Sequence, residues 1–532
     1  MKTAPTFASS AASALRWNYA GSVSRMLLGL GVNIFLTRLL GPKPFGQLSV
    51  ALIINSLAGL LGDIGVSSAL IQKPNLDEGD IRYGFTVQVG VGLLLTCILF
   101  FTAPLWAHFF HDPGLLPVLQ ALSAIFFIQG LGLTSVALLK RSLKFRTLQI
   151  CFISSYLIAY LGVGIPLAIR GAGVWSLVSA QLSQITIQTI ALHINVRHSI
   201  RPLWDRKRSG LLTFGARVLG ANLSCWGISN LDNTFVGRVD GPEALGLYGR
   251  AFLLAQLPGE ALISTLQQVL LPAMSRVQSD KQKLARVYQG AVGAVALVLV
   301  PLFSAMAVVP YAIIVGLYGN RWLGAVAVFS PLALSMPVHA MMALTGPSLA
   351  AMGKTKVEMK VQAFGLIFAV AAYWSAVHYS LPLLGWSVFV VYILRFYLMT
   401  AAICKELELR WRKLVEVLFP AFALGSITTL TALLTKTVTS GLPPVYQLIC
   451  VALADGVVLS LTMYIASRLF LGPIFSCIPE LHSIVPVTLE RFLPLRVALS
   501  STPSVPLRGG VTAISASVAV PTVLRSPRSP SG

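Results

Sequence analysis

Eight charged residues of this sequence lie inside long apolar runs, where an unpaired charge is costly. They are four arginines and four acids: Arg25, Asp63, Arg217, Asp232, Arg250, Glu260, Arg395 and Asp455. A charged side chain within a membrane span costs about 2.5–3.5 kcal/mol, so each one needs a partner or a water-filled cavity. A guanidinium stays charged and can donate two parallel hydrogen bonds to the oxygens of a phosphate, so the arginines could bind a phosphate-bearing ligand.

Three of the arginines are candidates for binding an anionic group: Arg25, Arg217 and Arg250. Arg25 lies about 15 Å along its run at ~1.5 Å per helical residue, which is deep for a side chain that must reach the membrane surface. Arg217 and Arg250 lie nearer to run ends, so extension toward lipid headgroups is an equal alternative for them. The candidates for ion coupling or charge pairing are Asp63, Asp232 and Glu260.

A stretch of the sequence occurs twice, 200 positions apart, as Asn33–Gly46 and Asn233–Gly246. Both copies carry Asn, Phe, Arg, Gly, Pro and Gly at the same places, and in both an apolar run precedes and another follows. This pattern predicts helix, sharp turn and helix, since glycine accepts a positive φ and proline ends the preceding helix. The repeated turn residues are Gly41, Pro42, Gly46, Gly241, Pro242 and Gly246. A repeat of this kind in a membrane chain predicts two similar lobes, the usual design of a transporter.

The composition excludes a soluble protein. The chain has 532 residues, of which 55% are hydrophobic and only 11% charged, whereas soluble domains carry about 25% charged residues. Forty Lys and Arg residues against 18 acids give a net charge of +22. Because the basic residues lie in short clusters between apolar runs, they indicate cytoplasmic loops and not a nucleic-acid surface.

Fourteen apolar runs are long enough to cross a hydrocarbon core of about 30 Å. They lie near 15–40, 45–71, 83–108, 115–139, 147–169, 172–195, 210–236, 244–272, 287–318, 322–352, 359–379, 381–404, 413–435 and 445–470. With the N-terminus in the cytoplasm, 24 Lys and Arg residues fall in cytoplasmic segments before the tail and six in outside loops. This bias predicts a multi-pass protein with both termini in the cytoplasm.

These runs predict an all-helical polytopic protein with six regions. A cytoplasmic segment covers 1–14, and a first lobe of six spans covers 15–196. A basic cytoplasmic linker at 197–209 leads to a second lobe of six spans at 210–404. Two further spans occupy 405–470, and a cytoplasmic tail at 471–532 has the composition of a disordered segment.

The sequence carries no pattern of an enzyme. It has no GK[ST] phosphate loop, no histidine pair and no nucleophile elbow. The six cysteines lie far apart without metal-ligand spacing, and Asp77-Glu78-Gly79-Asp80 is interpreted as the acidic first turn of the third span. We therefore expect no catalytic residue, no bound metal and no cofactor.

Several motifs resemble those of Wzx-type polysaccharide flippases, in the polysaccharide-transporter branch of the multidrug/oligosaccharidyl-lipid/polysaccharide exporter superfamily. The resemblance covers roughly residues 10–470 and is strongest before residue 290. Its motifs are Thr37–Pro42 with Phe45-Gly46, Asp63–Gln72, Gly171–Val178, Asp232–Arg238, Ala244–Ala251 and Leu271–Arg276.

The resemblance implies transport of an undecaprenyl-diphosphate-linked oligosaccharide across the bacterial inner membrane, for exopolysaccharide, capsule or O-antigen synthesis. It implies a V-shaped pair of lobes like that of the multidrug (MATE) branch, with two extra helices, working by alternating access. Arg25, Arg217 and Arg250 are then the residues expected to hold the diphosphate. The expected partners are the lipid-linked oligosaccharide, membrane lipids and a polysaccharide polymerase or export complex, without nucleic acid.

Three other functions stay open. A cation-coupled multidrug antiporter of the same superfamily would favour a cavity dominated by carboxylates, whereas four arginines accompany the four acids here. A membrane enzyme of glycan synthesis would need a large loop with catalytic carboxylates, and every loop between the runs is short. The third is a non-catalytic scaffold of a polysaccharide assembly complex.

Overall fold

The computed structural model describes residues 7–62, 66–205, 216–276 and 280–469. Within these ranges the chain is helical and contains no strand, as the periodicity of the sequence predicts. The expected N-terminal segment lies partly, and the expected tail wholly, outside the described residues, as do Asp63 and the side chain of Arg217.

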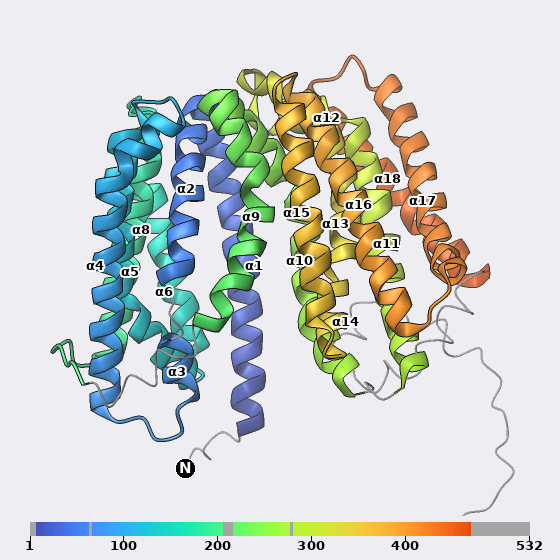
Figure 1. The fold of residues 1–532 in the computed structure, drawn as a ribbon. Helices are drawn as coiled ribbons and strands as arrows, with labels where there is room; N and C mark the ends of the chain where they lie inside the picture. Colours follow the sequence, from blue (N-terminus) through green and yellow to red (C-terminus); the bar gives the residue numbers. More distant parts are fainter. Residues whose placement is uncertain (1–6, 63–65, 206–215, 277–279, 470–532) are drawn as a thin grey trace, which may run out of the picture. The chain divides into compact units, whose positions relative to one another are not determined.

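The helices follow one another with short connections (Figure 1). The first half contains α1 Phe7–Leu39, α2 Pro42–Gly62, α3 Val66–Gln72, α4 Glu78–Phe109, α5 Leu115–Arg141, α6 Phe145–Ala159, the π-helix η1 Tyr160–Gly164, α7 Ile165–Ile169 and α8 Val174–Val196. The second half contains α9 Ala216–Val239, α10 Gly241–Arg276, α11 Lys281–Val308, α12 Pro310–Tyr318, the 3₁₀-helix η3 Asn320–Ala325, α13 Val326–Ala343, α14 Thr345–Ala351, α15 Thr355–Val377 and α16 Leu381–Leu407. Two more helices follow, α17 Trp411–Val438 and α18 Pro444–Leu469.

Ten of the described segments are long and apolar enough to cross a membrane, which makes the chain a multi-pass membrane protein. Four other helices of 21 residues or more, α2, α8, α9 and α10, are not among these ten. The expected break near residue 380 is confirmed, since α15 ends at Val377 and α16 begins at Leu381 after the N-cap Ser380.

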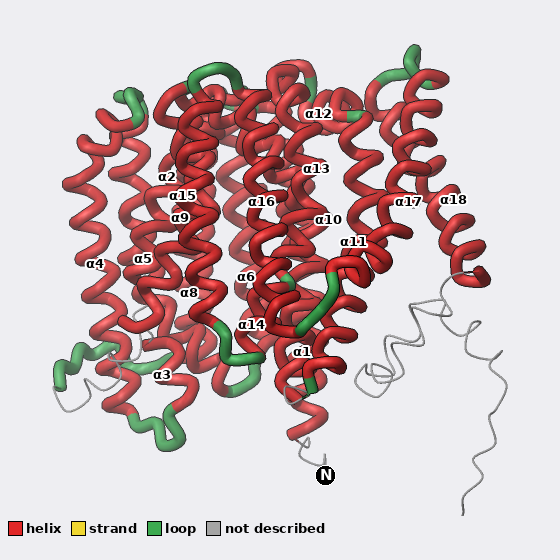
Figure 2. The backbone as a smooth tube through the Cα atoms, turned by 45° about the vertical axis from the view of Figure 1, so that its right-hand side comes forward, coloured by secondary structure: helices red, strands yellow, loops and turns green. Residues whose placement is uncertain are grey.

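Each half packs mainly within itself, and Figure 2 shows the described segments as helices joined by short loops. In the first half α5 packs against α4 and α8, and α6 packs against α1 and α8. In the second half α16 packs against α13 and α15, and α11 packs against α13 and α17, which in turn contacts α18. Contacts between the halves run through α2 with α9 and α10, and through α1 with α12. Of these helices, α1, α2, α9 and α10 carry the repeat.

The acidic cluster before the third span is a helix cap, as predicted. The Asp80 backbone N–H donates to Asp77 Oδ1 at 2.6 Å, and the Asp77 N–H donates to Asp80 Oδ2 at 3.2 Å, a capping box at the start of α4. Lys73 Nζ lies 2.5 Å from the same Asp80 oxygen. The carboxylates of Asp77 and Asp80 thus have structural partners. The described residues include no cluster that could hold a metal.

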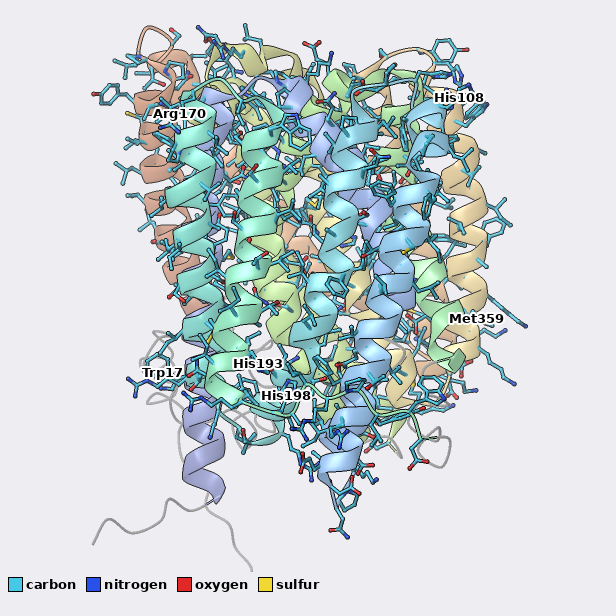
Figure 3. All side chains as sticks on the ribbon, turned by 90° about the vertical axis from the view of Figure 1, so that its left-hand side faces the viewer. Trp17, His108, Arg170, His193, His198 and Met359 are labelled. Atoms are coloured by element: carbon cyan, nitrogen blue, oxygen red, sulfur yellow. The ribbon has the colours of Figure 1, made fainter. Side chains whose placement is uncertain are left out.

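The described part of the expected linker, 197–205, lies against α4 and α5. His198 Nε2 lies 3.1 Å from Ser135 Oγ, and the backbone N–H of Leu203 donates to Thr86 Oγ1 at 2.8 Å. Arg82 donates to the carbonyl oxygens of Arg201 and Pro202. His198 and His193 lie at the end of the helices opposite to His108 and Arg170 (Figure 3).

Candidate functional site

The two copies of the repeat contact each other at their turns. A Cβ atom on Gly46 in α2 would overlap the carbonyl oxygen of Pro242 in α10, and one on Gly246 in α10 would overlap that of Pro42 in α2. Both would lie inside the 3.0 Å that real Cβ atoms keep from other atoms, so only glycine permits this approach. Because the two contacts exchange partners 200 positions apart, the halves meet with local two-fold symmetry.

The turns themselves differ between the copies. Gly241 has a φ of +82°, as predicted for a turn that needs glycine. Gly41 is not among the glycines with positive φ, so the expectation of a left-handed glycine in the first turn is wrong. The first copy turns instead at Leu40 and Gly41 and then enters α2 at Pro42, which occupies a helix start where its missing N–H has no cost.

The arginine of each copy contacts the opposite half. Arg38, at the end of α1, donates from Nε to the carbonyl oxygen of Leu317 at 2.7 Å and from Nη2 to that of Gly316. Arg238, at the end of α9, contacts both ring nitrogens of His111, Nε2 at 2.7 Å, and its guanidinium lies 5.1 Å from the ring of Phe109. Arg38 and Arg238 are two of the six basic residues expected in outside loops, although their matching positions in the repeat were a signal of a shared role.

Arg250 joins α10 to the first half. Its Nη1 donates to Asn33 Oδ1 of α1 at 2.8 Å, and its guanidinium lies 4.5 Å from the centre of the Phe45 ring in α2. The Nε atom is buried and has no hydrogen-bond partner among the described residues. Arg250 therefore lies at the contact between the halves and retains a free donor.

The structure does not bring the three candidate arginines together by any contact among the described residues. Arg25 is partly exposed on α1, where its guanidinium lies 5.0 Å from the Phe152 ring of α6, within the first half. Its Nε is likewise buried without a hydrogen-bond partner in the described part of the chain. The side chain of Arg217 lies outside what the structure describes.

Of the candidate acids, Asp232 has the most defined surroundings. It is 4% exposed and accepts hydrogen bonds from Tyr248 Oη at 2.5 Å and from the backbone N–H of Asn233 at 2.8 Å. The hydroxyl of Tyr248 was not singled out from the sequence, because a tyrosine in an apolar helix is most often only a packing residue. Glu260 is exposed and accepts a hydrogen bond from Gln256 at 3.4 Å.

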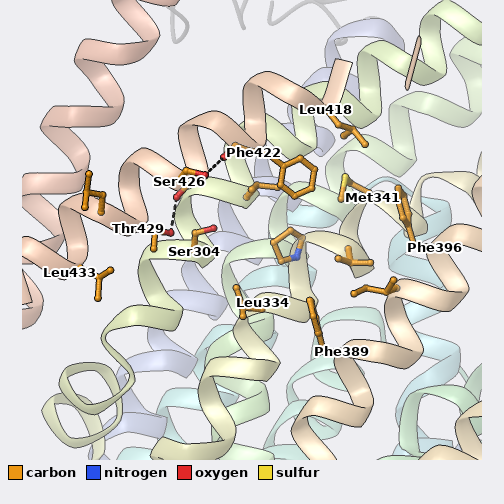
Figure 4. Close-up of a pocket in the computed structure, with 16 residues that line it drawn as sticks. Ser304, Leu334, Met341, Phe389, Phe396, Leu418, Phe422, Ser426, Thr429 and Leu433 are labelled. Carbon is orange, nitrogen blue, oxygen red and sulfur yellow. Dashed lines mark hydrogen bonds between the residues drawn. The ribbon is translucent and has the colours of Figure 1, made fainter. Parts of the chain in front are cut away.

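A pocket of about 670 Å³ opens between α11, α13, α16 and α17 (Figure 4). Phe389, Phe396 and Phe422 lie in its wall. Two hydroxyls in the wall are satisfied by their own helix: Ser426 donates to the Phe422 carbonyl at 3.0 Å, and Thr429 to that of Gly425 at 2.8 Å. The wall is therefore effectively apolar and contains none of the candidate charged residues.

Comparisons with known proteins agree with the sequence motifs. A family model described as "Polysaccharide biosynthesis protein" matches residues 35–327, more than half of the chain, and this range includes most of both copies of the repeat. The lipopolysaccharide biosynthesis protein WzxC of Escherichia coli is 23% identical over 68% of this chain and 74% of its own length. The succinoglycan biosynthesis transport protein ExoT of Rhizobium meliloti is 25% identical over 56% of this chain and 61% of its own length.

Two solved structures share the fold. The lipid II flippase MurJ in an inward closed conformation superposes with a TM-score of 0.65 at 12% identity, covering 84% of this chain and 98% of MurJ. An inward-facing multidrug resistance MATE family transporter superposes with a TM-score of 0.56 at 15% identity, covering 72% of this chain and 95% of the transporter. The chain thus has the helical fold of these membrane proteins, and by its sequence it belongs to the family of polysaccharide biosynthesis proteins related to WzxC.

Proposed function

We propose that this protein is a flippase that moves an undecaprenyl-diphosphate-linked oligosaccharide from the inner to the outer leaflet of a bacterial inner membrane. The product would feed the synthesis of an exopolysaccharide, a capsule or an O-antigen, with a polysaccharide polymerase or export complex as partner. The observation that carries the proposal is the family match, because it spans the repeat by which the two halves contact each other. Related proteins named for lipopolysaccharide and succinoglycan support the substrate class.

The proposed architecture has fourteen spans. Ten segments meet the length and hydropathy expected of a span, and α2, α8, α9 and α10 add the other four. Residues 15–196 and 210–404 form two lobes in a V, residues 405–470 add two spans, and the segments 1–14, 197–209 and 471–532 are cytoplasmic.

In a mechanism of alternating access, the contact between the repeat copies would act as a gate on one side of the membrane. The distribution of Lys and Arg predicts that the Gly41-Pro42 turn faces the outside. The reciprocal contacts of Gly46 with Pro242 and of Gly246 with Pro42 then close the path on that side. Release of the oligosaccharide outside requires that these contacts separate while contacts form at the other end.

The proposed binding residues for the diphosphate are Arg25, Arg217 and Arg250. Arg250 has the strongest support, because it is held by Asn33 and Phe45 and still has a free Nε donor. In the outward-open state these contacts break, and a phosphate oxygen replaces Asn33 as the acceptor. Asp63, Asp232 and Glu260 stay candidates for coupling to an ion gradient, and Asp232 is the one seen buried with donors around its carboxylate.

Export in living cells tests this function. In a host whose own flippase gene is deleted, the protein should restore surface polysaccharide, and Arg25→Ala and Arg217→Ala should abolish that restoration without lowering the amount of protein in the membrane. Arg170→Ala, at an exposed position at the same end as His108, is the matched control. Normal export by both variants would contradict the role of these arginines, and drug efflux without any polysaccharide would identify a multidrug antiporter.

A further inference from the structure

A second pocket, of about 600 Å³, lies where α1, the α12–η3 connection and the start of α18 meet. Its polar lining residues are Arg38, Tyr311, Tyr318, Asn320 and Arg321. Among the residues that the structure describes, none of those lining this pocket is acidic. This lining contrasts with the apolar wall of the first pocket and carries two positive charges.

Both arginines are held in place and keep donors free. Arg38 uses Nε and Nη2 on the carbonyl oxygens of Leu317 and Gly316, and Arg321 donates from Nη1 to the Leu39 carbonyl at 3.2 Å. A guanidinium has five N–H groups, so these bonds leave several donors available on each side chain. Backbone carbonyls thus fix two guanidinium groups beside one pocket, and a guanidinium is the group that best matches phosphate oxygens.

Tyr318 forms part of the pocket wall. The residue is only 1% exposed, and its hydroxyl is buried and has no hydrogen-bond partner among the described residues. Its ring lies 5.6 Å from that of Trp322, whose Nε1 donates to the Thr37 carbonyl at 2.9 Å. Tyr318 therefore contributes a packed wall, and the donors that a ligand in the pocket can reach are those of the two arginines.

The surroundings place a lipid headgroup at this pocket. It lies at the ends of membrane-spanning helices, the depth at which headgroups lie. Tyr311 and Val445 in its rim are 45% and 43% exposed, and Tyr446 beside it is 61% exposed. Aromatic and apolar side chains around a cationic centre suit a ligand that has both a phosphate and a hydrocarbon part. The pocket also includes the first residues of the 26-residue α18, whose helix dipole favours an anion there.

We propose that this pocket binds the phosphate oxyanion of a lipid headgroup, held by Arg38 and Arg321. Arg38 and Arg321 also bond the two halves to each other. A bound phosphate therefore stabilises the contact between the halves. The pocket shares no residue with the proposed diphosphate site of Arg25, Arg217 and Arg250, and binding there does not require transport.

Binding to the purified full-length protein in detergent tests the proposal. The probes are dioctanoyl phosphatidic acid, dioctanoylglycerol, which lacks the phosphate, and inorganic phosphate. We expect phosphatidic acid to bind at least about tenfold more tightly than either of the others and to raise the melting temperature. Equal affinity for dioctanoylglycerol would overturn the role of the phosphate, and equal affinity for inorganic phosphate would overturn the lipid headgroup as the ligand.

Three variants separate binding from folding. Arg321→Gln should weaken phosphatidic acid binding about tenfold, whereas the control Arg170→Gln should leave it unchanged. Tyr318→Phe should raise the melting temperature of the unliganded protein, because it removes an unsatisfied hydroxyl, and should leave the affinity for phosphatidic acid unchanged. Unchanged affinity in Arg321→Gln would overturn the proposal. Since no step measures translocation, this result is independent of whether the protein is a flippase.

Discussion

At the scale of single residues, the charges inside the apolar runs lie in different surroundings. Arg250 bonds across the two halves, Asp232 accepts donors from its own half, and Arg25 lies over an aromatic ring. Arg395 is 5% exposed and donates to Gln362 Oε1 at 2.7 Å. Asp455 is 6% exposed, and both its carboxylate oxygens lack a hydrogen-bond partner among the described residues.

Replacing Arg250 by lysine keeps the charge but removes the planar group that lies on Phe45 and reaches Asn33. A charge-assisted hydrogen bond contributes about 1.5–3 kcal/mol, so we expect the transport rate to fall roughly ten- to a hundredfold. The measurement is the initial rate of translocation in proteoliposomes containing equal amounts of protein. Arg170→Lys should transport normally, and a normal rate for Arg250→Lys would contradict the proposed role.

The bond from Tyr248 to Asp232 should stabilise the second half. Tyr248→Phe leaves the buried carboxylate with one donor fewer and should lower the free energy of unfolding by about 1–3 kcal/mol. Asp232→Asn combined with Tyr248→Phe should cost less than the sum of the two single changes, because the two groups act as one unit. Additive losses in thermal unfolding experiments would show that the two side chains act independently.

Of the charged residues that the sequence places inside apolar runs, Asp232, Arg395 and Asp455 are buried, whereas Glu260 is exposed. The sequence did not predict the partners of any of them. An arginine at position 250 in an apolar run indicates that its charge needs a partner. That partner, Asn33, lies 217 positions earlier in the chain. Only the folded arrangement of α1 against α10 selects that partner. The same holds for Tyr318, whose unsatisfied hydroxyl is visible only once its neighbours are placed.

At the scale of elements, two glycines set how closely α2 and α10 approach. Gly46→Ala and Gly246→Ala should each separate the helices, because a Cβ atom would overlap a proline carbonyl of the other helix. In a cysteine-free background, a single cysteine at Ser49, which lies opposite Gly249, should then react severalfold faster with a maleimide that cannot cross the membrane.

Gly41→Ala is the matched control for both variants. It lies in the same turn, but a Cβ atom there would meet nothing within 4 Å. Its labelling rate should equal that of the parent protein. If Gly46→Ala and Gly246→Ala also label at the parent rate, the two helices do not close the path at this end.

The packing of 197–205 on α4 and α5 should depend on pH. Burial lowers the pKa of His198 below its ordinary value near 6.5, so the folded protein favours the neutral ring. The stability that this ring contributes is present above about pH 6.5 and is lost as the pH falls below that value toward the folded pKa. The melting temperature should therefore fall between pH 6.5 and 5 by more in the parent protein than in His198→Gln, and equal falls would contradict this account.

At the scale of the whole molecule, apolar runs and short breaks predicted the helices well. The expected gap near residue 380, the paired long helices and the capped start of α4 all appear in the structure. Run lengths could not predict the irregular elements within single runs. Residues 147–169 contain the π-helix η1, and residues 287–318 divide at Val309 before Pro310, because side-chain packing and proline geometry decide such breaks.

The repeat predicted two related halves, and it also marks where they touch. Matching residues 200 positions apart contact each other's turn, through Gly46 with Pro242 and Gly246 with Pro42. The sequence alone did not predict this contact. A repeat shows that two segments are similar, but not which of their surfaces meet. The movement of the two lobes during transport belongs to the proposed alternating access, which the repeat by itself does not describe.

Translocation of a fluorescent undecaprenyl-diphosphate oligosaccharide in proteoliposomes, followed by the accessibility of its sugar to an added glycosidase, tests the central claim most directly. We predict that the sugar becomes accessible at a rate proportional to the amount of protein, and that Gly246→Ala slows this rate at least tenfold while Gly41→Ala does not. A sugar that stays protected at every protein concentration, in vesicles where the protein is folded, would contradict the assignment as a flippase.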